Sequence, residues 1–207
     1  MEDYERRRYR GLDQRIVHAR EIRLIRACFR AMRAAGEDEA RGAPALDLPC
    51  GYGRFTDALR NDGWALSHSD LSFEMVRRAK AKSGLSGAVA DAKRGLPFRP
   101  GAFRLVFSVR FFHHLHDPAD RAAVLGEFRR VSAAWAVVSF YRANALHRLQ
   151  RRARRLFNKS RTNIKMIGAG QFEREAETAG FEVVFVKPLF KGLHAYHLAL
   201  LRKRQPL

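Results

Sequence analysis

Short apolar runs alternate along the chain with longer segments that have the periodicity of helices. Runs suited to buried strands occur at 45–48, 64–69, 87–90, 105–109, 135–139, 181–186 and 194–200. Between several of these runs, apolar residues recur at the three- and four-residue spacing of an amphipathic helix. Strands that alternate with helices are typical of a mostly parallel sheet covered by helices. The pattern therefore predicts an α/β fold and excludes an all-β protein or a simple helix bundle.

Capping residues mark where the predicted helices begin and end. A first helix is expected over about 5–35, and its apolar face carries Ile22, Ile25, Phe29 and Met32. Ser72 is a typical N-cap for a helix that continues through residue 82. Asp117 followed by Pro118 begins another helix, which continues to about residue 131. A last helix is expected to end at 179–180.

The chain contains no internal repeat and no low-complexity linker, which favours one compact unit of 207 residues. We expect a basic helical arm over 1–42, followed by a main domain over 43–207. Within that domain, a basic amphipathic insertion is expected at about 142–165.

An acidic residue closes each of the first three predicted strands. Asp47 precedes a glycine turn that opens a helix, Asp70 follows 23 residues later, and Asp91 follows 21 residues after that. Glycines let a ligand approach the backbone, and a helix N-terminus offers free N–H groups. A carboxylate about 20 residues beyond such a turn is well placed to accept hydrogen bonds from a ribose. The spacing predicts a nucleoside cofactor at these strand ends, although each acid could also serve as a helix cap or turn former.

Four segments resemble, in order and spacing, the class I S-adenosylmethionine-dependent methyltransferases, particularly the bacterial group with a type 11 methyltransferase domain. The segments are LDLPCGYGRFT (46–56), HSDLSFEMVRRA (68–79), VADAKRGLPFRPGAFRLVFSVRFFHHLHDP (89–118) and EFRRVSAAWAVVSF (127–140). The resemblance extends over about 43–203. It implies a Rossmann-like, seven-stranded, mostly parallel sheet of order 3-2-1-4-5-7-6, with strand 7 antiparallel and helices on the flanks.

The resemblance also implies a site for S-adenosyl-L-methionine at the strand ends. The turn from Asp47 to Gly53 would hold the methionine end, Asp70 the ribose hydroxyls, and Asp91 the adenine amine. Around these, Leu71, Met75 and Ala92 would contact the adenine, and Ser108 to Arg110 would lie beneath the transferable methyl. The full set of implied cofactor-binding residues is Asp47, Leu48, Pro49, Cys50, Gly51, Gly53, Asp70, Leu71, Met75, Asp91, Ala92, Ser108 and Val109.

Two positions depart from the family pattern. Pro49 stands where the family has the first glycine of its turn, and Ser132-Ala133-Ala134 replaces a common pair of glycines. Proline removes an N–H group, so one backbone contact to a cofactor is in question. The main alternative interpretation of such a turn is a nicotinamide or flavin oxidoreductase. The glycine motif of those enzymes requires glycine at position 56, where this chain has Thr56.

Methyl transfer from a sulfonium requires alignment of donor and acceptor and exclusion of water, and a general base only when the acceptor arrives protonated. The candidate catalytic residues are His113, His114, Arg110 and Tyr141. A histidine could remove a proton, and Arg110 could anchor an acidic substrate group. The two histidines could equally hold their loop to the sheet. We expect no metal site at His113, His114 and His116, because adjacent side chains diverge and no carboxylate has suitable spacing.

The charge of the chain adds candidate partners. Lys and Arg number 40 against 21 Asp and Glu, a net charge of +19, while 46% apolar residues exclude a wholly disordered chain. The segment 142–165 has nine Lys or Arg, no Asp or Glu, and a narrow apolar stripe. This stripe suits either an anionic membrane surface with a lipid-like acceptor or RNA, and it could also simply pack on the domain with its arginines in solvent.

The remaining expectations concern location and function. Two scattered cysteines, no secretory signal and no spanning segment predict a cytoplasmic protein, with peripheral contact at the inner membrane surface if the insertion binds lipid. Tyr4 and Tyr9 could cover the cofactor. We expect a methyltransferase for a small-molecule or lipid-like acceptor. The alternatives are an RNA methyltransferase and a non-catalytic basic binding module.

Overall fold

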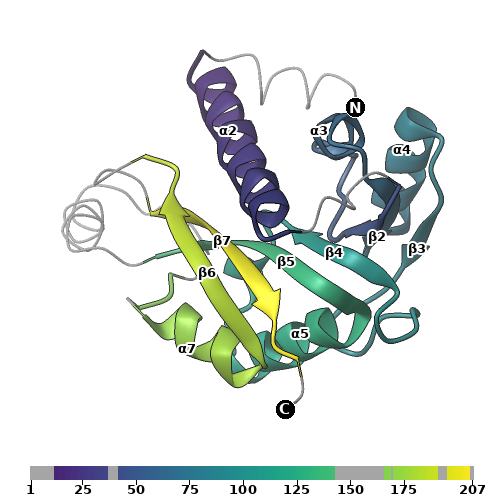
Figure 1. The fold of residues 1–207 in the computed structure, drawn as a ribbon. Coiled ribbons are helices and arrows are strands. Elements are labelled where there is room, and N and C mark those ends of the chain that lie inside the picture. The colour runs from purple at the N-terminus through teal and green to yellow at the C-terminus, as the bar shows by residue number, and fades with distance from the viewer. Residues whose placement is uncertain (1–11, 37–41, 143–165, 169, 191–194, 206–207) are drawn as a thin grey trace, which may run out of the picture.

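The computed structural model describes residues 12–36, 42–142, 166–168, 170–190 and 195–205 (Figure 1). Its strands form one seven-stranded sheet in the order β3-β2-β1-β4-β5-β7-β6. Strands β1 to β5 pair in parallel with their neighbours, and β7 runs antiparallel to β5 and β6. The strands are β1 (Pro44–Asp47), β2 (Ala65–Asp70), β3 (Gly87–Val89), β4 (Phe103–Ser108), β5 (Ser132–Tyr141), β6 (Phe181–Pro188) and β7 (Tyr196–Lys203). The expected fold class is confirmed.

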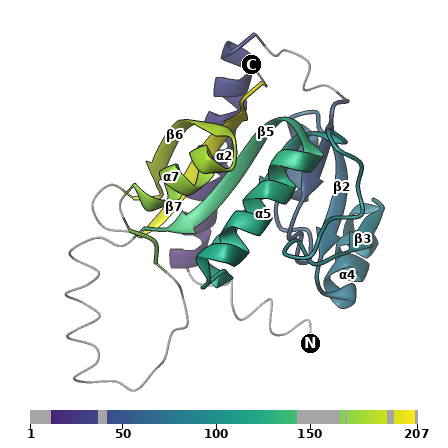
Figure 2. The ribbon, with the colours of Figure 1, turned by 90° about the horizontal axis from the view of Figure 1, so that it is seen from below.

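Helices cover both faces of this sheet (Figures 1 and 2). They are α2 (Leu12–Ala34), α3 (Thr56–Asn61), α4 (Phe73–Ser83), the 3-10 helix η1 (Phe112–His114), α5 (Pro118–Val131) and α7 (Gln171–Thr178). Side chains alternate between the two faces of a strand. In β4, Val106 packs in the cluster that contains α5 and α7, while Leu105 and Phe107 pack in the cluster that contains α2 and α3. The central strands are therefore buried on both faces, which explains their unbroken apolar runs.

The N-terminal helix α2 lies against the sheet. Its predicted stripe is confirmed, because Ile25, Phe29 and Met32 are buried beside residues of the central strands. Phe29 packs against Trp64 with ring centroids 6.0 Å apart. The part of the predicted helix before residue 12 lies outside the described residues, as do Tyr4 and Tyr9, and the domain boundary at 42 stays a prediction.

The predicted caps are present, whereas several strand ends differ from expectation. The Ser72 hydroxyl accepts from the Met75 N–H, and the Asp117 carboxylate accepts from the Ala119 N–H. Strand β5 extends beyond the expected 135–139 on both sides, and β7 runs to Lys203 instead of ending at 200. The two strands form an antiparallel ladder from Trp135 opposite Arg202 to Tyr141 opposite Tyr196. This pairing carries basic and polar residues into the strands, which a search for apolar runs does not anticipate.

The basic insertion falls almost entirely outside the described residues, at 143–165. The residues on either side of it are adjacent, because Arg142 forms a parallel bridge with Ile167 and the Ile167 N–H donates to the Tyr141 carbonyl at 2.8 Å. The chain thus leaves and rejoins the described structure at the carboxyl end of β5.

Candidate active site at the carboxyl ends of the strands

The turn that follows β1 is bonded to the neighbouring strands on both sides. The Leu48 N–H donates to the Phe107 carbonyl of β4, and the Cys50 N–H donates to the Ser69 carbonyl of β2, both at 2.9 Å. The peptide bond between Leu48 and Pro49 is cis. Proline at the first glycine position is thus accommodated, since the turn is anchored by the N–H groups on either side of it.

Glycine is required at position 53. Its φ is 76°, in the left-handed region, and an added Cβ would lie 2.9 Å from the Thr56 hydroxyl and 3.7 Å from the Ala79 backbone. The turn therefore passes close to α4 before the chain enters α3, and glycine permits this close packing.

Asp70 links this turn to the end of β2. One carboxylate oxygen accepts from the Gly51 N–H at 2.9 Å, and the other accepts from the Ser72 N–H at 3.0 Å. Each oxygen retains further acceptor capacity, because a carboxylate has about four lone-pair sites. The predicted neighbourhood of the glycine turn and Asp70 is thus present, and the carboxylate is held in a fixed position.

Asp47 is buried in the interior of the protein. Burial, and secondarily the charge of Asp70, raises the pKa of Asp47 well above its usual value. His68 Nδ1 lies 3.7 Å from Asp47 Oδ2, and burial lowers the pKa of His68. Both shifts favour the neutral forms, since an isolated charge is costly away from water. Within the described part of the chain, Asp47 Oδ2 and the Ser69 and Ser108 hydroxyls are buried without a hydrogen-bond partner, which leaves polar groups at the ends of β1, β2 and β4.

Large apolar side chains are exposed beside Asp70. Leu71 is 67% exposed, Phe73 69% and Val89 49%. Val89 is paired with Asp70 across the β2–β3 ladder. A local concentration of exposed apolar surface often marks a ligand contact. The arrangement offers an apolar neighbourhood for a planar group beside a carboxylate that can bind hydroxyls.

Asp91 and Ala92 follow β3 at the same edge. The Asp91 carboxylate accepts from the Lys93 N–H at 3.0 Å and lies 3.6 Å from the Arg94 guanidinium, while Ala92 is buried. Met75, in the first turn of α4, is half-buried. Asp91 therefore also forms a turn of its own, as a carboxylate without a ligand role would.

The candidate catalytic residues come together at the ends of β4 and β5. The His113 ring lies 4.0 Å from the His114 ring and 4.9 Å from the Tyr141 ring, as centroid distances. His113 is buried, whereas His114 is exposed. Burial, and then the neighbouring His114, lowers the pKa of His113 to about 4. At neutral pH this imidazole is uncharged and a weak base.

Arg110 joins this group through a residue that sequence reasoning missed. Glu21 of α2 is 1% exposed, and its two carboxylate oxygens accept from Arg110 Nε at 2.8 Å and from Arg54 Nη2 at 2.6 Å. His18 Nδ1 lies 3.2 Å from the same Arg54 nitrogen. The sequence does contain one indication that Glu21 is buried. It is the single acid between 14 and 36, and it lies four residues before Ile25 on the apolar face.

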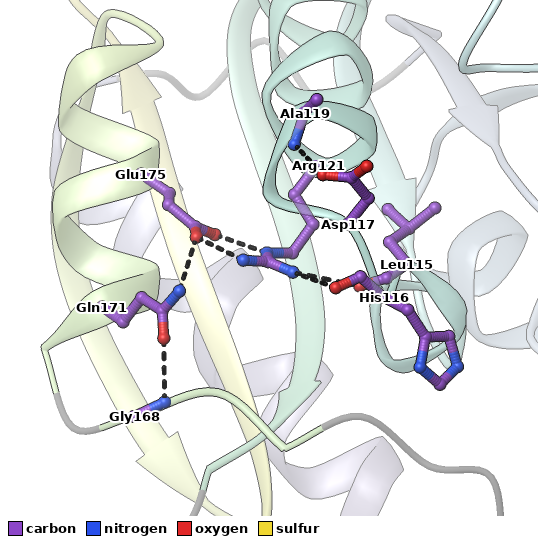
Figure 3. A network of polar contacts seen from close by, with 8 residues as sticks. All are labelled: Leu115, His116, Asp117, Ala119, Arg121, Gly168, Gln171 and Glu175. Atoms are coloured by element: carbon purple, nitrogen blue, oxygen red, sulfur yellow. Dashed lines mark hydrogen bonds and ion pairs between the residues drawn. The ribbon is translucent and has the colours of Figure 1, made fainter.

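The buried Arg121 of α5 fixes the histidine loop from the other side (Figure 3). Arg121 of α5 donates to the Leu115 and His116 carbonyls, each at 3.2 Å, and forms a two-bond ion pair with Glu175 of α7 at 2.7 and 2.8 Å. Gln171 continues the network by donating to Glu175, and it accepts from the Gly168 N–H. The loop after η1 is thereby tied to both helices of one face.

Neither a metal-binding cluster nor a membrane-spanning helix is found in the described part of the chain. Among the described residues, no three metal-ligating side chains lie close enough to hold a metal ion, and this applies to His113, His114 and His116 as well. No helix there has the length and apolar character needed to cross a bilayer.

Comparison with known proteins identifies a similar domain. Residues 46–138 match the model of a methyltransferase domain. A segment of 112 residues, 54% of this chain, is 31% identical to a malonyl-[acyl-carrier protein] O-methyltransferase from Hamiltonella defensa, and it spans only 42% of that enzyme.

Solved structures agree in fold. A magnesium protoporphyrin IX methyltransferase from Synechocystis, with bound S-adenosylhomocysteine, superposes with a TM-score of 0.76 at 15% identity, covering 97% of this chain and 94% of that one. A methyltransferase from Methanosarcina mazei gives a TM-score of 0.68 at 15% identity, covering 80% and 94%. At such identities the likeness establishes the fold. The chain is therefore similar to S-adenosylmethionine-dependent methyltransferases, through the match over residues 46–138 and through the shared fold.

Proposed function

We propose that the protein transfers a methyl group from S-adenosylmethionine to an oxygen or nitrogen of a small-molecule or lipid-like acceptor. The observation that carries the proposal is the Asp70 carboxylate, fixed by the Gly51 and Ser72 N–H groups beside a glycine turn in a methyltransferase domain. A ribose presents two adjacent hydroxyls, for which a carboxylate with remaining lone pairs is a suitable partner.

The residues present fit this cofactor. The turn from Asp47 to Gly53 would receive the methionine end, Leu71 and Met75 would contact the adenine, and Asp91 would accept from its amine. Exposed apolar surface at Leu71 supports this assignment, since adenine would cover it. When bound, S-adenosylmethionine supplies a methyl group that is already activated on a sulfonium.

The residues after β4 would receive the acceptor. Their task is to hold the accepting atom about 3–3.5 Å from the methyl carbon and to exclude water. A neutral His113 with a pKa of about 4 is a weak base, so it is better suited to orienting an acceptor than to deprotonating an alcohol. An acceptor oxygen that is already deprotonated at neutral pH fits this site best, and the relative from Hamiltonella defensa is named as an O-methyltransferase.

The macromolecular alternatives depend on the basic segment, which lies outside the described residues. Binding to RNA and contact with an anionic membrane remain predictions, as does a cytoplasmic location.

The first test is calorimetric titration of the full chain with S-adenosylmethionine, S-adenosylhomocysteine and, as a control, NADH. We expect micromolar binding of the first two and none of NADH. Absence of binding to both sulfur ligands would contradict the proposal and favour a non-catalytic module. A positive result justifies a turnover screen, by release of S-adenosylhomocysteine, over carboxylic acids, phenols, amines, lipids and RNA.

A further inference from the structure

Arg110 has an unusual backbone conformation. Among the described residues it is the only non-glycine with a positive φ, at 63°. The left-handed region is disfavoured for a residue with a Cβ, and such conformations persist where the surroundings fix them, often at functional sites. The contacts that hold Arg110 in this conformation therefore also determine where its side chain lies.

Two contacts from distant parts of the chain fix Arg110. Its N–H donates to the Ser139 hydroxyl of β5 at 2.6 Å, and its Nε donates to Glu21 of α2 at 2.8 Å. Glu21 is in turn held by Arg54 at 2.6 Å. Backbone and guanidinium are therefore anchored independently, so the side chain is preorganised rather than free to rotate.

The terminal amino groups of Arg110 remain available. The described residues supply a hydrogen bond to Nε, and none to Nη1 or Nη2. The side chain is 32% exposed, and Cζ lies 5.9 Å from the centre of the Tyr196 ring. The Nη1 and Nη2 groups of a guanidinium form a planar fork that matches a carboxylate with two parallel bonds.

The charge of the cluster suits one negative charge. Two arginines, Arg54 and Arg110, face one carboxylate, Glu21, which leaves a net charge of +1. The other titratable groups near Arg110 are neutral at pH 7, because burial lowers the pKa of two of them and raises that of two others: His18, His113, Tyr141 and Tyr196. A singly charged carboxylate would balance these three groups, and Lys82, whose charge also acts on His18, is a further cation nearby.

We propose that Arg110 binds a carboxylate of the methyl acceptor through Nη1 and Nη2, with Glu21 of α2 as the residue that positions it. The inference rests on the proposed function, because it assigns the acceptor class to the same site. Arg110 follows β4 and lies near His113 and Tyr141, on the side assigned to the acceptor. Arg54, which follows the glycine turn, is the other partner of Glu21.

The test is a calorimetric titration of the full chain with acetate, malonate and glutarate, with glutaramide as the uncharged probe. Each is measured with and without saturating S-adenosylhomocysteine. We expect the dicarboxylates to bind at millimolar concentration and glutaramide not to bind. Arg110→Gln should weaken dicarboxylate binding at least tenfold. Arg110→Lys should retain part of it, because the charge is kept and the fork is lost.

Two controls separate the possible outcomes. Arg26→Gln, on the exposed face of α2, should bind the probes like the wild type. The double variant Glu21→Gln/Arg110→Gln removes the buried carboxylate together with its partner, so it serves if Arg110→Gln does not fold.

Several results would overturn the proposal. These are wild-type protein that binds no carboxylate up to 20 mM, equal binding by wild type and Arg110→Gln, and equal binding of glutarate and glutaramide. If Arg110→Gln instead loses S-adenosylhomocysteine affinity tenfold, Arg110 binds the carboxylate of the cofactor and the acceptor assignment is wrong. If the wild type binds glutarate but no S-adenosylhomocysteine, the anion site stands and the proposed methyltransferase function fails.

Discussion

The ends of β1 to β3 and the ends of β4, β5 and β7 form two halves of one edge of the sheet, and they are built differently. In the first half, backbone N–H groups and nearby carboxylates make the contacts, as between Gly51 and Asp70. In the second half, side chains from distant elements meet, as Arg110 and Glu21 do across 89 positions. The first half therefore depends on a local motif and the second on the packed fold. Substitutions should accordingly change cofactor affinity in the first half and stability in the second.

The largest effect is expected at Arg121, which supports the second half. Arg121→Ala removes the partner of Glu175 and the donor to two loop carbonyls, so we expect a loss of about 3 kcal/mol in the free energy of unfolding. Urea denaturation measures it. The double variant Arg121→Met/Glu175→Met should recover most of the loss, because no unpaired charge remains. Arg94→Ala, at a side chain that is 89% exposed, is the matched control. A loss no larger than that of the control would show that the network contributes little.

The next effect is a pH dependence at His113. Its pKa in the folded protein is about 4, against an ordinary value of 6.5, so the unfolded chain binds the proton more readily. The stability that comes from keeping His113 neutral is complete above pH 6.5. It is lost as the pH falls toward 4, by about 3 kcal/mol at most. Denaturation at pH 7.5 and 4.5 should therefore show a smaller difference for His113→Gln than for the wild type. His116→Gln, at an exposed position of the same loop, is the control, and a ring pKa near 6.5 by NMR titration would refute the prediction.

In the first half, Asp70→Ala should weaken S-adenosylhomocysteine binding by about 1–3 kcal/mol, through loss of a charged hydrogen-bond acceptor and of the contact that fixes Gly51. The domain should remain folded, because the β2 ladder is unaffected. Calorimetry measures the affinity, and Asp57→Ala on the exposed first turn of α3 is the control. Unchanged affinity would remove Asp70 from the cofactor site.

The smallest effect is expected at Leu71. Leu71→Ala should cost about 1 kcal/mol of cofactor affinity if adenine covers this side chain, and nothing measurable in the free energy of unfolding, because the side chain is exposed in the protein alone. Val184→Ala, an exposed residue on β6, should change neither quantity. A loss of stability without a loss of affinity would place Leu71 in the packing of the domain.

His114→Ala should also leave cofactor binding intact, so turnover is the measurement that reveals any catalytic role for it.

Sequence reasoning predicted most of the local structure of the first half. Three features of this half depend on neighbours within a few residues, so they can be recognised in the sequence. They are the turn after Asp47, the acid at the end of β2 and the Ser72 cap. The bond between Asp70 and the Gly51 N–H was not predicted, yet it requires only that two adjacent parallel strands end at the same edge. At the other end of the sheet, the basic end of β7 was missed because pairing, and not apolar character, determines the length of that strand.

Apolar periodicity, glycine positions and capping residues in the sequence by themselves determined the α/β class, the starts of α4 and α5, and the strand ends where a nucleoside cofactor would bind. These signals act over a few residues, where backbone geometry and local hydrogen bonds decide the outcome. The tertiary structure alone decided that Glu21 meets Arg54 and Arg110, that Arg121 meets Glu175, and that His113 is kept neutral. Burial and ion pairing depend on which elements the sheet order brings together. An ion pair between residues that are tens of positions apart produces no periodic pattern in the sequence.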